Sequence, residues 1–150
     1  QLSCSPDVWA WGGYGVLRGS GYSSEYLQRD YATILAGRTG DNVVIMLGTN
    51  DAQWGLMPTT EQLNTISANM ISAGAASVRW MTIPPVASTA TPQLKMYREA
   101  WVQRVQATPH VVDATGALGP VLLAQHRSDT IHLNAAGHAA LARGVNAAVC

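Results

Sequence analysis

The chain has 150 residues, 47% of them hydrophobic, and its formal net charge is +0. This length and composition suffice for a single domain, residues 1–150, with a buried core. The balanced charge gives no electrostatic reason to expect nucleic acid or an anionic membrane as a partner. No apolar run approaches the roughly 20 residues that span a bilayer.

Predicted elements begin with two short strands, Leu2–Cys4 and Val16–Arg18, and a tight turn at 19–21. A helix over about Ser23–Ala36 follows, because apolar residues recur there with helical spacing before Gly37. Its buried face comprises Leu27, Tyr31, Ile34 and Leu35.

The apolar run Asn42–Leu47 leads directly into Gly48-Thr49-Asn50-Asp51. A short continuous apolar run bounded by turn residues suits a strand buried on both faces of a parallel sheet. Ligands bind beyond the carboxyl ends of such strands, so we expect Gly48–Asp51 to project into a site. A core strand followed by an ordinary turn is the alternative.

Helices and strands alternate through the rest of the chain. Thr59 with Gln62 resembles a capping box for a helix that ends before Gly74, and Pro92 suits the first turn of the next helix. The faces predicted to be buried are Leu63, Ile66, Met70 and Ile71 in one helix, and Leu94, Tyr97, Trp101 and Val105 in the other. The remaining elements are strands at 77–83 and 111–113, a short helix within 116–127, a loop at 129–132 and a last helix at 134–148. This alternation predicts a three-layer α/β/α fold with a mainly parallel sheet.

Asp129 and His132 carry the clearest chemistry in the sequence. A carboxylate three residues before a histidine can accept the Nδ1–H of the imidazole, which leaves Nε2 free to act as a base. His110, His126 and His138 have no comparable partner and are interpreted as structural or surface residues. No histidine or cysteine pair has metal-ligand spacing, and Gly19-Ser20-Gly21 lacks the rest of a phosphate-binding loop, so we expect no metal and no cofactor.

Together, Gly48-Thr49-Asn50-Asp51 after a buried strand and Asp129-Thr130-Ile131-His132 before the last helix resemble the SGNH (GDSL-like) hydrolase superfamily. Gly19-Ser20-Gly21 resembles the second conserved block of that family, so the resemblance spans residues 16–150. It implies a flavodoxin-like fold of the SGNH-hydrolase type, with a first strand and helix that are shortened here.

The resemblance assigns a role to several residues. Asn50 through its side-chain amide and Gly21 through its backbone N–H would bind a developing oxyanion, with His132 as general base and Asp129 as its orienting carboxylate. Asp51 would fix the loop. The residues expected to contact substrate are Asp51, Trp54 and Ser20.

The sequence departs from the family at the nucleophile, because it contains no Gly-Asp-Ser. Ser5 is the best positional candidate, if Leu2–Cys4 is a shortened first strand. Ser20 is the second candidate and would require Val16–Arg18 to be the first strand. The third alternative is that no serine attacks.

Three functions therefore stay open. The first is an ester hydrolase or acyl transferase acting on small acyl esters, including acetyl groups on carbohydrate. The second is a glycan-cleaving enzyme that uses a carboxyl pair drawn from Asp129, Asp51, Asp7 and Glu25. The third is a non-catalytic carbohydrate-binding module whose surface is Trp9, Trp11 and Trp54. We expect a small-molecule or glycan substrate and a monomeric protein.

The two cysteines, Cys4 and Cys150, stand at opposite ends of the sequence. Because domain termini often lie close together, we expect them to form a disulfide; two unpaired thiols in a cytosolic protein are the alternative. A bridge over nearly the whole chain would contribute about 4–5 kcal/mol. Disulfides favour an oxidising compartment, so we expect a secreted or periplasmic protein. Gln1 is not followed by a charged-then-apolar leader, which indicates that a signal peptide is absent or already removed.

Overall fold

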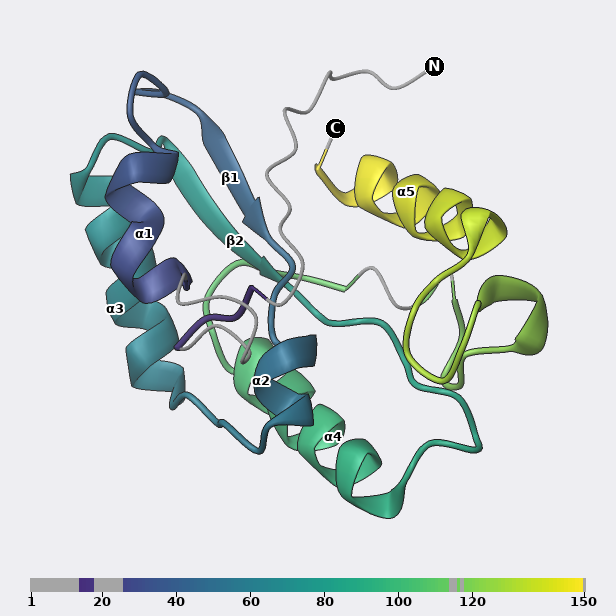
Figure 1. The fold of residues 1–150 in the computed structure, drawn as a ribbon. Helices are drawn as coiled ribbons and strands as arrows, with labels where there is room; N and C mark the ends of the chain where they lie inside the picture. Colours follow the sequence, from purple (N-terminus) through teal and green to yellow (C-terminus); the bar gives the residue numbers. More distant parts are fainter. Residues whose placement is uncertain (1–13, 18–25, 114–115, 117, 150) are drawn as a thin grey trace.

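The computed structural model describes residues 14–17, 26–113, 116 and 118–149 (Figure 1). Its elements are α1 (Leu27–Ile34), β1 (Asn42–Ile45), α2 (Thr49–Gln53), α3 (Thr60–Ser72), β2 (Ser77–Met81), α4 (Pro92–Gln106), β3 (Val111–Val112), the short 3-10 helix η2 (Ala124–His126) and α5 (Ala135–Val149). The strand predicted at Leu2–Cys4 and the turn at 19–21 lie outside the described residues.

The described strands form one parallel sheet in the order β1-β2-β3. Asn42 is opposite Ser77 in the first pair, and Trp80 is opposite Val111 in the second. Parallel neighbours require crossover connections, and the helices α3 and α4 supply them. The predicted mainly parallel α/β sheet is confirmed.

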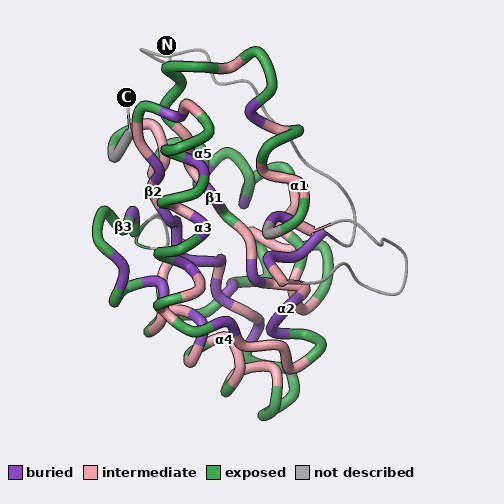
Figure 2. The backbone as a smooth tube through the Cα atoms, turned by 90° about the vertical axis from the view of Figure 1, so that its left-hand side faces the viewer, coloured by how far each residue is buried: buried purple, intermediate pink, exposed green. Residues whose placement is uncertain are grey.

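The side chains of β1 and β2 alternate between two hydrophobic clusters. Val43, Ile45, Val78 and Trp80 join the larger cluster, which also contains residues of α1, α3 and α4. Val44 and Met81 point the other way and join a smaller cluster with Leu141 of α5. The helices α1 and α3 therefore lie on one side of the sheet and α5 on the other, which makes three layers (Figure 1). Figure 2 shows the buried segments concentrated where these layers meet.

The predicted start signals of α3 and α4 are confirmed. Thr59 and Gln62 form the predicted capping box, because the Thr59 hydroxyl accepts the Gln62 N–H at 3.1 Å and the Gln62 amide oxygen accepts the Thr59 N–H at 2.8 Å. The fourth helix opens at Pro92 as predicted, with Thr91 as its N-cap. The predicted burial of Ile71 is wrong. Its side chain is 51% exposed, because it lies about 100° around α3 from the buried Met70.

Other boundaries differ from the prediction. The strand expected at Val16–Arg18 is not formed by the described residues 16 and 17, whose backbone N–H groups bond a side chain rather than a neighbouring strand. The helix expected over 23–36 is described as α1, Leu27–Ile34. The strand β1 ends at Ile45, and Met46 after it is 38% exposed, so the expected burial of this run on both faces holds only in part.

Candidate active site

The first part of the site is the junction between β1 and α2. Gly48 has φ 125°, a backbone conformation that residues other than glycine rarely adopt. A Cβ atom at Gly48 would overlap the indole of Trp101, which is fully buried on α4. The sharp turn lets Thr49–Gln53 start the short helix α2 at once. The loop expected at Gly48–Asp51 is thus replaced, from Thr49 on, by a helix.

Asn50 lies in the first turn of α2 and is half-buried. Its side-chain Nδ2 donates a hydrogen bond of 2.9 Å to the Tyr14 carbonyl oxygen. A primary amide carries two N–H donors, so the second one remains for a ligand. Gly21, which the sequence pairs with Asn50 as an oxyanion donor, lies outside the described residues.

Asp51 is fully buried beside Asn50. Its Oδ2 accepts the Val16 N–H at 2.9 Å, and its Oδ1 accepts the Leu17 N–H at 3.2 Å. Burial raises the pKa of the Asp51 carboxyl above 3.8, although these two N–H groups favour its ionised form. In this position the carboxyl holds residues 16 and 17 against α2. It is not open to a substrate, which corrects its expected place among the substrate contacts.

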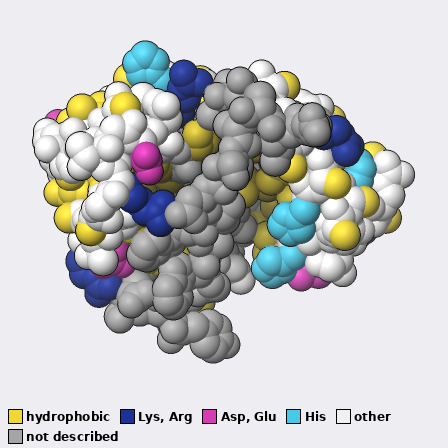
Figure 3. Space-filling model, turned by 90° about the horizontal axis from the view of Figure 1, so that it is seen from above, with side chains coloured by type: hydrophobic (Ala, Val, Ile, Leu, Met, Phe, Trp, Pro, Cys, Tyr) yellow, Lys and Arg dark blue, Asp and Glu magenta, His cyan; other side chains and the backbone are white. Residues whose placement is uncertain are grey.

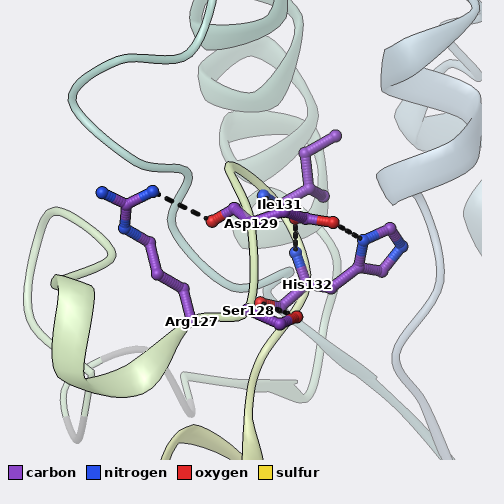
Figure 4. Close-up of polar contacts among 5 residues, drawn as sticks. All are labelled: Arg127, Ser128, Asp129, Ile131 and His132. Atoms are coloured by element: carbon purple, nitrogen blue, oxygen red, sulfur yellow. Dashed lines mark hydrogen bonds and ion pairs between the residues drawn. The ribbon is translucent and has the colours of Figure 1, made fainter.

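The second part of the site is the turn Ser128–His132 (Figure 4). Asp129 Oδ1 accepts the N–H groups of Ile131 and His132, both at 2.7 Å, which is the local bonding pattern that aspartate favours in turns. Asp129 Oδ2 lies 2.6 Å from His132 Nδ1. The hydrogen bond predicted from the spacing is therefore present. Since Nδ1 faces the carboxylate, Nε2 is the nitrogen left to exchange a proton.

Residues on either side hold this turn in place. The side-chain amide of Asn134 donates to the carbonyl oxygens of Gln125 and Arg127 at 3.0 and 3.2 Å, and its oxygen accepts the Gly137 N–H that starts α5. A Cβ at Gly137 would overlap the His126 carbonyl oxygen, so α5 approaches η2 at a distance that only glycine allows. The pair Asp129–His132 is exposed, but the backbone that presents it is fixed.

The contacts of Asp129 hold the pKa of its carboxyl well below its ordinary value of 3.8, chiefly through the His132 N–H and then the His132 imidazole. Because the pKa of Asp129 is lower in the folded state, its ionised carboxylate stabilises the fold above about pH 3.8. This contribution is lost as the pH falls from 3.8 toward the folded-state pKa. We expect the free energy of unfolding of the wild type to exceed that of Asp129→Ala at neutral pH, and the difference to shrink below pH 3.8. Urea unfolding of both proteins across this range measures it; a difference that grows in acid would contradict the assignment.

The structure gives a position to some of the other predicted site residues. Trp54 caps the C-terminal end of α2 and is 59% exposed. Its place one helical turn after Asn50 is compatible with a contact to substrate, which stays a prediction. The candidate nucleophiles Ser5 and Ser20, the pair Cys4 and Cys150, and the aromatic residues Trp9 and Trp11 lie outside the described residues.

Sequence reasoning missed the partners that anchor the first part of the site. Tyr14 accepts the Asn50 amide, and Trp101 occupies the space beside Gly48. Both contacts join residues far apart in the sequence, so no local pattern announces them. For the second part of the site, Asn134 did carry a signal, because asparagine is a favoured residue before a helix, where its side-chain oxygen accepts an N–H of the first turn, here that of Gly137.

Basic and acidic side chains are dispersed over the face shown in Figure 3 rather than gathered in one patch. No described helix is long and apolar enough to cross a membrane. Within the described part of the chain, no three His, Cys, Asp or Glu side chains are grouped to hold a metal ion.

Comparison with known proteins gives a consistent result. The GDSL-like Lipase/Acylhydrolase family matches residues 6–140. No protein with a curated description matches the sequence.

Solved structures similar to this chain include TesA, with a TM-score of 0.59 and 23% sequence identity over 83% of this chain and 78% of that one. The lipase/acylhydrolase from Enterococcus faecalis has a TM-score of 0.58 and 23% identity over 81% of this chain and 68% of that one. A third is Est24, a carbohydrate acetylesterase from Sinorhizobium meliloti, with a TM-score of 0.60 and 17% identity over 85% of this chain and 69% of that one. Against a structure from Streptococcus pneumonia, the chain covers only 58% of that protein. At these identities the structures support the fold alone.

Proposed function

Because the chain belongs to the GDSL-like lipase/acylhydrolase family, we propose that it hydrolyses small acyl esters, with His132 as the general base. The observation that carries the proposal is the 2.6 Å contact between Asp129 Oδ2 and His132 Nδ1, in a turn whose carboxylate is fixed by two backbone N–H groups. Such a carboxylate orients the imidazole and stabilises it once it is protonated.

The proposed reaction starts with a serine hydroxyl. Its oxygen attacks the ester carbonyl carbon while His132 Nε2 takes the hydroxyl proton, and the carbonyl π electrons move to the oxygen. The tetrahedral intermediate then collapses, the alcohol leaves with the proton from His132, and an acyl-serine remains. Water, or an acceptor hydroxyl in the case of transfer, resolves the acyl-serine by the same steps. Ser5 is our candidate for the nucleophile, from its position in the sequence.

Asn50 is the proposed oxyanion donor. Its Nδ2 is anchored on the Tyr14 carbonyl and retains a second N–H, so the amide is pre-oriented before substrate arrives. Donors that are fixed in advance stabilise the developing charge without reorganisation. We propose that Gly21 adds a backbone N–H and that Ser20 and Trp54 contact the substrate.

Acetyl groups on carbohydrate are the substrate that we favour. The similar structure of Est24 is that of a carbohydrate acetylesterase, and the exposed indole of Trp54 offers a flat apolar surface of the kind on which sugar rings pack. The buried Asp51 is a poor partner for Asp129 in the carboxyl pair that glycan cleavage requires, and the other two candidates, Asp7 and Glu25, lie outside the described residues.

We also propose that the protein is secreted or periplasmic and monomeric, with a disulfide between Cys4 and Cys150. The support for the disulfide and for the compartment is the placement of the only two cysteines at opposite ends of the sequence. Thiol labelling of the unfolded protein with and without a reductant distinguishes the bridge from two free thiols.

The test of the proposed activity compares Asn50→Ala with the wild type on p-nitrophenyl acetate. Removing one oxyanion donor is expected to lower kcat about 10²–10³-fold, with a smaller change in KM, because the bond strengthens in the transition state. Asn69→Ala, on the exposed face of α3, is the matched control and should keep full activity. Cleavage of p-nitrophenyl glycosides without hydrolysis of the acetate would instead favour a glycan-cleaving enzyme.

A further inference from the structure

A cavity lies between the start of α4 and the segments 86–88 and 120–121. Its volume is about 260 Å³, enough for a ligand of a few heavy atoms. The lining combines three charged side chains with apolar walls: Lys95, Arg98 and Glu99, and Val86, Pro120 and Val121. No part of the reaction proposed above uses these residues.

Arg98 is the main charge in this cavity. It is half-buried, and its Nη2 and Nε donate to the carbonyl oxygens of Ile83 and Pro84 at 3.0 and 3.3 Å. A guanidinium has five N–H donors, so three are left after these two bonds. No carboxylate of the described residues lies within ion-pair distance of it. Burial lowers the pKa of Arg98, whereas the more distant negative charges of Glu99 and Asp113 raise it.

Lys95 is the second cation and the only lysine of the chain. It precedes Arg98 by three residues on α4, so both side chains lie on the same face of the helix. Its Nζ donates to the Ser88 carbonyl at 2.6 Å, which fixes the ammonium at the cavity and leaves two N–H groups free. The cavity thus holds two anchored cations with unused donors.

The apolar walls are also held in place. Leu122 N–H donates to the Val86 carbonyl at 3.1 Å, and Ala87 N–H donates to the Thr130 carbonyl at 2.9 Å. The second bond joins one wall to the turn that carries Asp129 and His132. The cavity is therefore built on fixed backbone rather than on side chains alone.

We propose that this cavity binds a small organic monocarboxylate, with the carboxylate on Arg98 and Lys95 and a short hydrocarbon part against Val86 and Val121. A planar guanidinium pairs well with a carboxylate through parallel hydrogen bonds. The charges of Lys95, Arg98 and Glu99 in the lining sum to about +1, so the cavity attracts an anion. The proposal does not depend on the esterase activity.

Butyrate is the probe, with butyramide as its uncharged isostere. In a titration followed by ¹H–¹⁵N NMR, butyrate at millimolar concentration should shift the amide signals of Ala87 and Val121, and butyramide should not. Arg98→Lys should weaken butyrate binding by about 10-fold, because the bidentate fork is lost. Lys95→Gln should weaken it about 3-fold, as expected for an exposed pair. The His132→Ala protein should bind butyrate like the wild type, which separates this site from the proposed catalytic one.

Glu99→Gln is the complementary variant, and it removes no contact that holds the backbone. It should tighten butyrate binding about 3-fold, because the repelling carboxylate is gone. Equal shifts with butyrate and butyramide, or no shift with butyrate in the folded wild type, would overturn the proposal. Unchanged butyrate affinity in both Arg98→Lys and Lys95→Gln would overturn it as well.

Discussion

Replacing Gly48 by alanine is expected to lower the free energy of unfolding by about 4 kcal/mol. Two costs add at this position. The backbone at φ 125° is strained for any residue with a Cβ, which costs about 1–3 kcal/mol. The new methyl group would also overlap the Trp101 indole, and overpacking in a core costs about 1–3 kcal/mol. Trp101 is fully buried in the larger hydrophobic cluster, so a shift of its ring would disturb the core.

The matched control is Gly37→Ala. Gly37 also has a positive φ, 75°, but a Cβ there would meet nothing within 4 Å. The Gly37→Ala protein should therefore lose only about 1–2 kcal/mol of unfolding free energy, which is the cost of the backbone conformation alone. Urea unfolding of the two variants separates strain from overlap, and equal losses would contradict the tight contact between Gly48 and Trp101. Gly48→Ala should also reduce esterase activity, because Gly48 sets the direction of the helix that carries Asn50.

Replacing His132 by alanine is expected to lower kcat on p-nitrophenyl acetate by about 10²–10⁴-fold, the usual contribution of a positioned general base. Stability should change little, since the His132 side chain is 75% exposed and packs into no core. His138→Ala is the control. His138 is an exposed histidine on α5, six residues farther along the chain, and it should retain the wild-type rate. A similar loss in both variants would show that the effect is not specific to the pair with Asp129.

Features that are encoded locally were predictable from the sequence. The capping box of α3 needs only Thr59 and Gln62, three residues apart, and the turn at Asp129 needs only a carboxylate and the N–H groups two and three residues later. The contact between Asp129 and His132 follows from the same short spacing. In each case the bond forms within one turn of backbone, so the residue types decide the geometry.

Features that depend on distant partners were not predictable. Val16 and Leu17 have the composition of a strand, but the buried carboxyl of Asp51 takes their N–H groups and no regular strand forms there. Gly48 signalled a turn, but only the position of Trp101, on another helix, explains why the turn is so sharp that α2 follows at once. The apolar character of Ile71 suggested burial, whereas the packing of α3 leaves it facing solvent.

The central claim is that His132 activates a serine, and labelling with a fluorophosphonate probe tests it most directly. Intact mass followed by peptide mapping should give a single adduct on the wild type, at Ser5, and none on the folded His132→Ala protein. An adduct at Ser20 would keep the mechanism and move the nucleophile. A wild-type protein that is folded and forms no adduct, or an adduct that persists at the same rate in His132→Ala, would contradict the account.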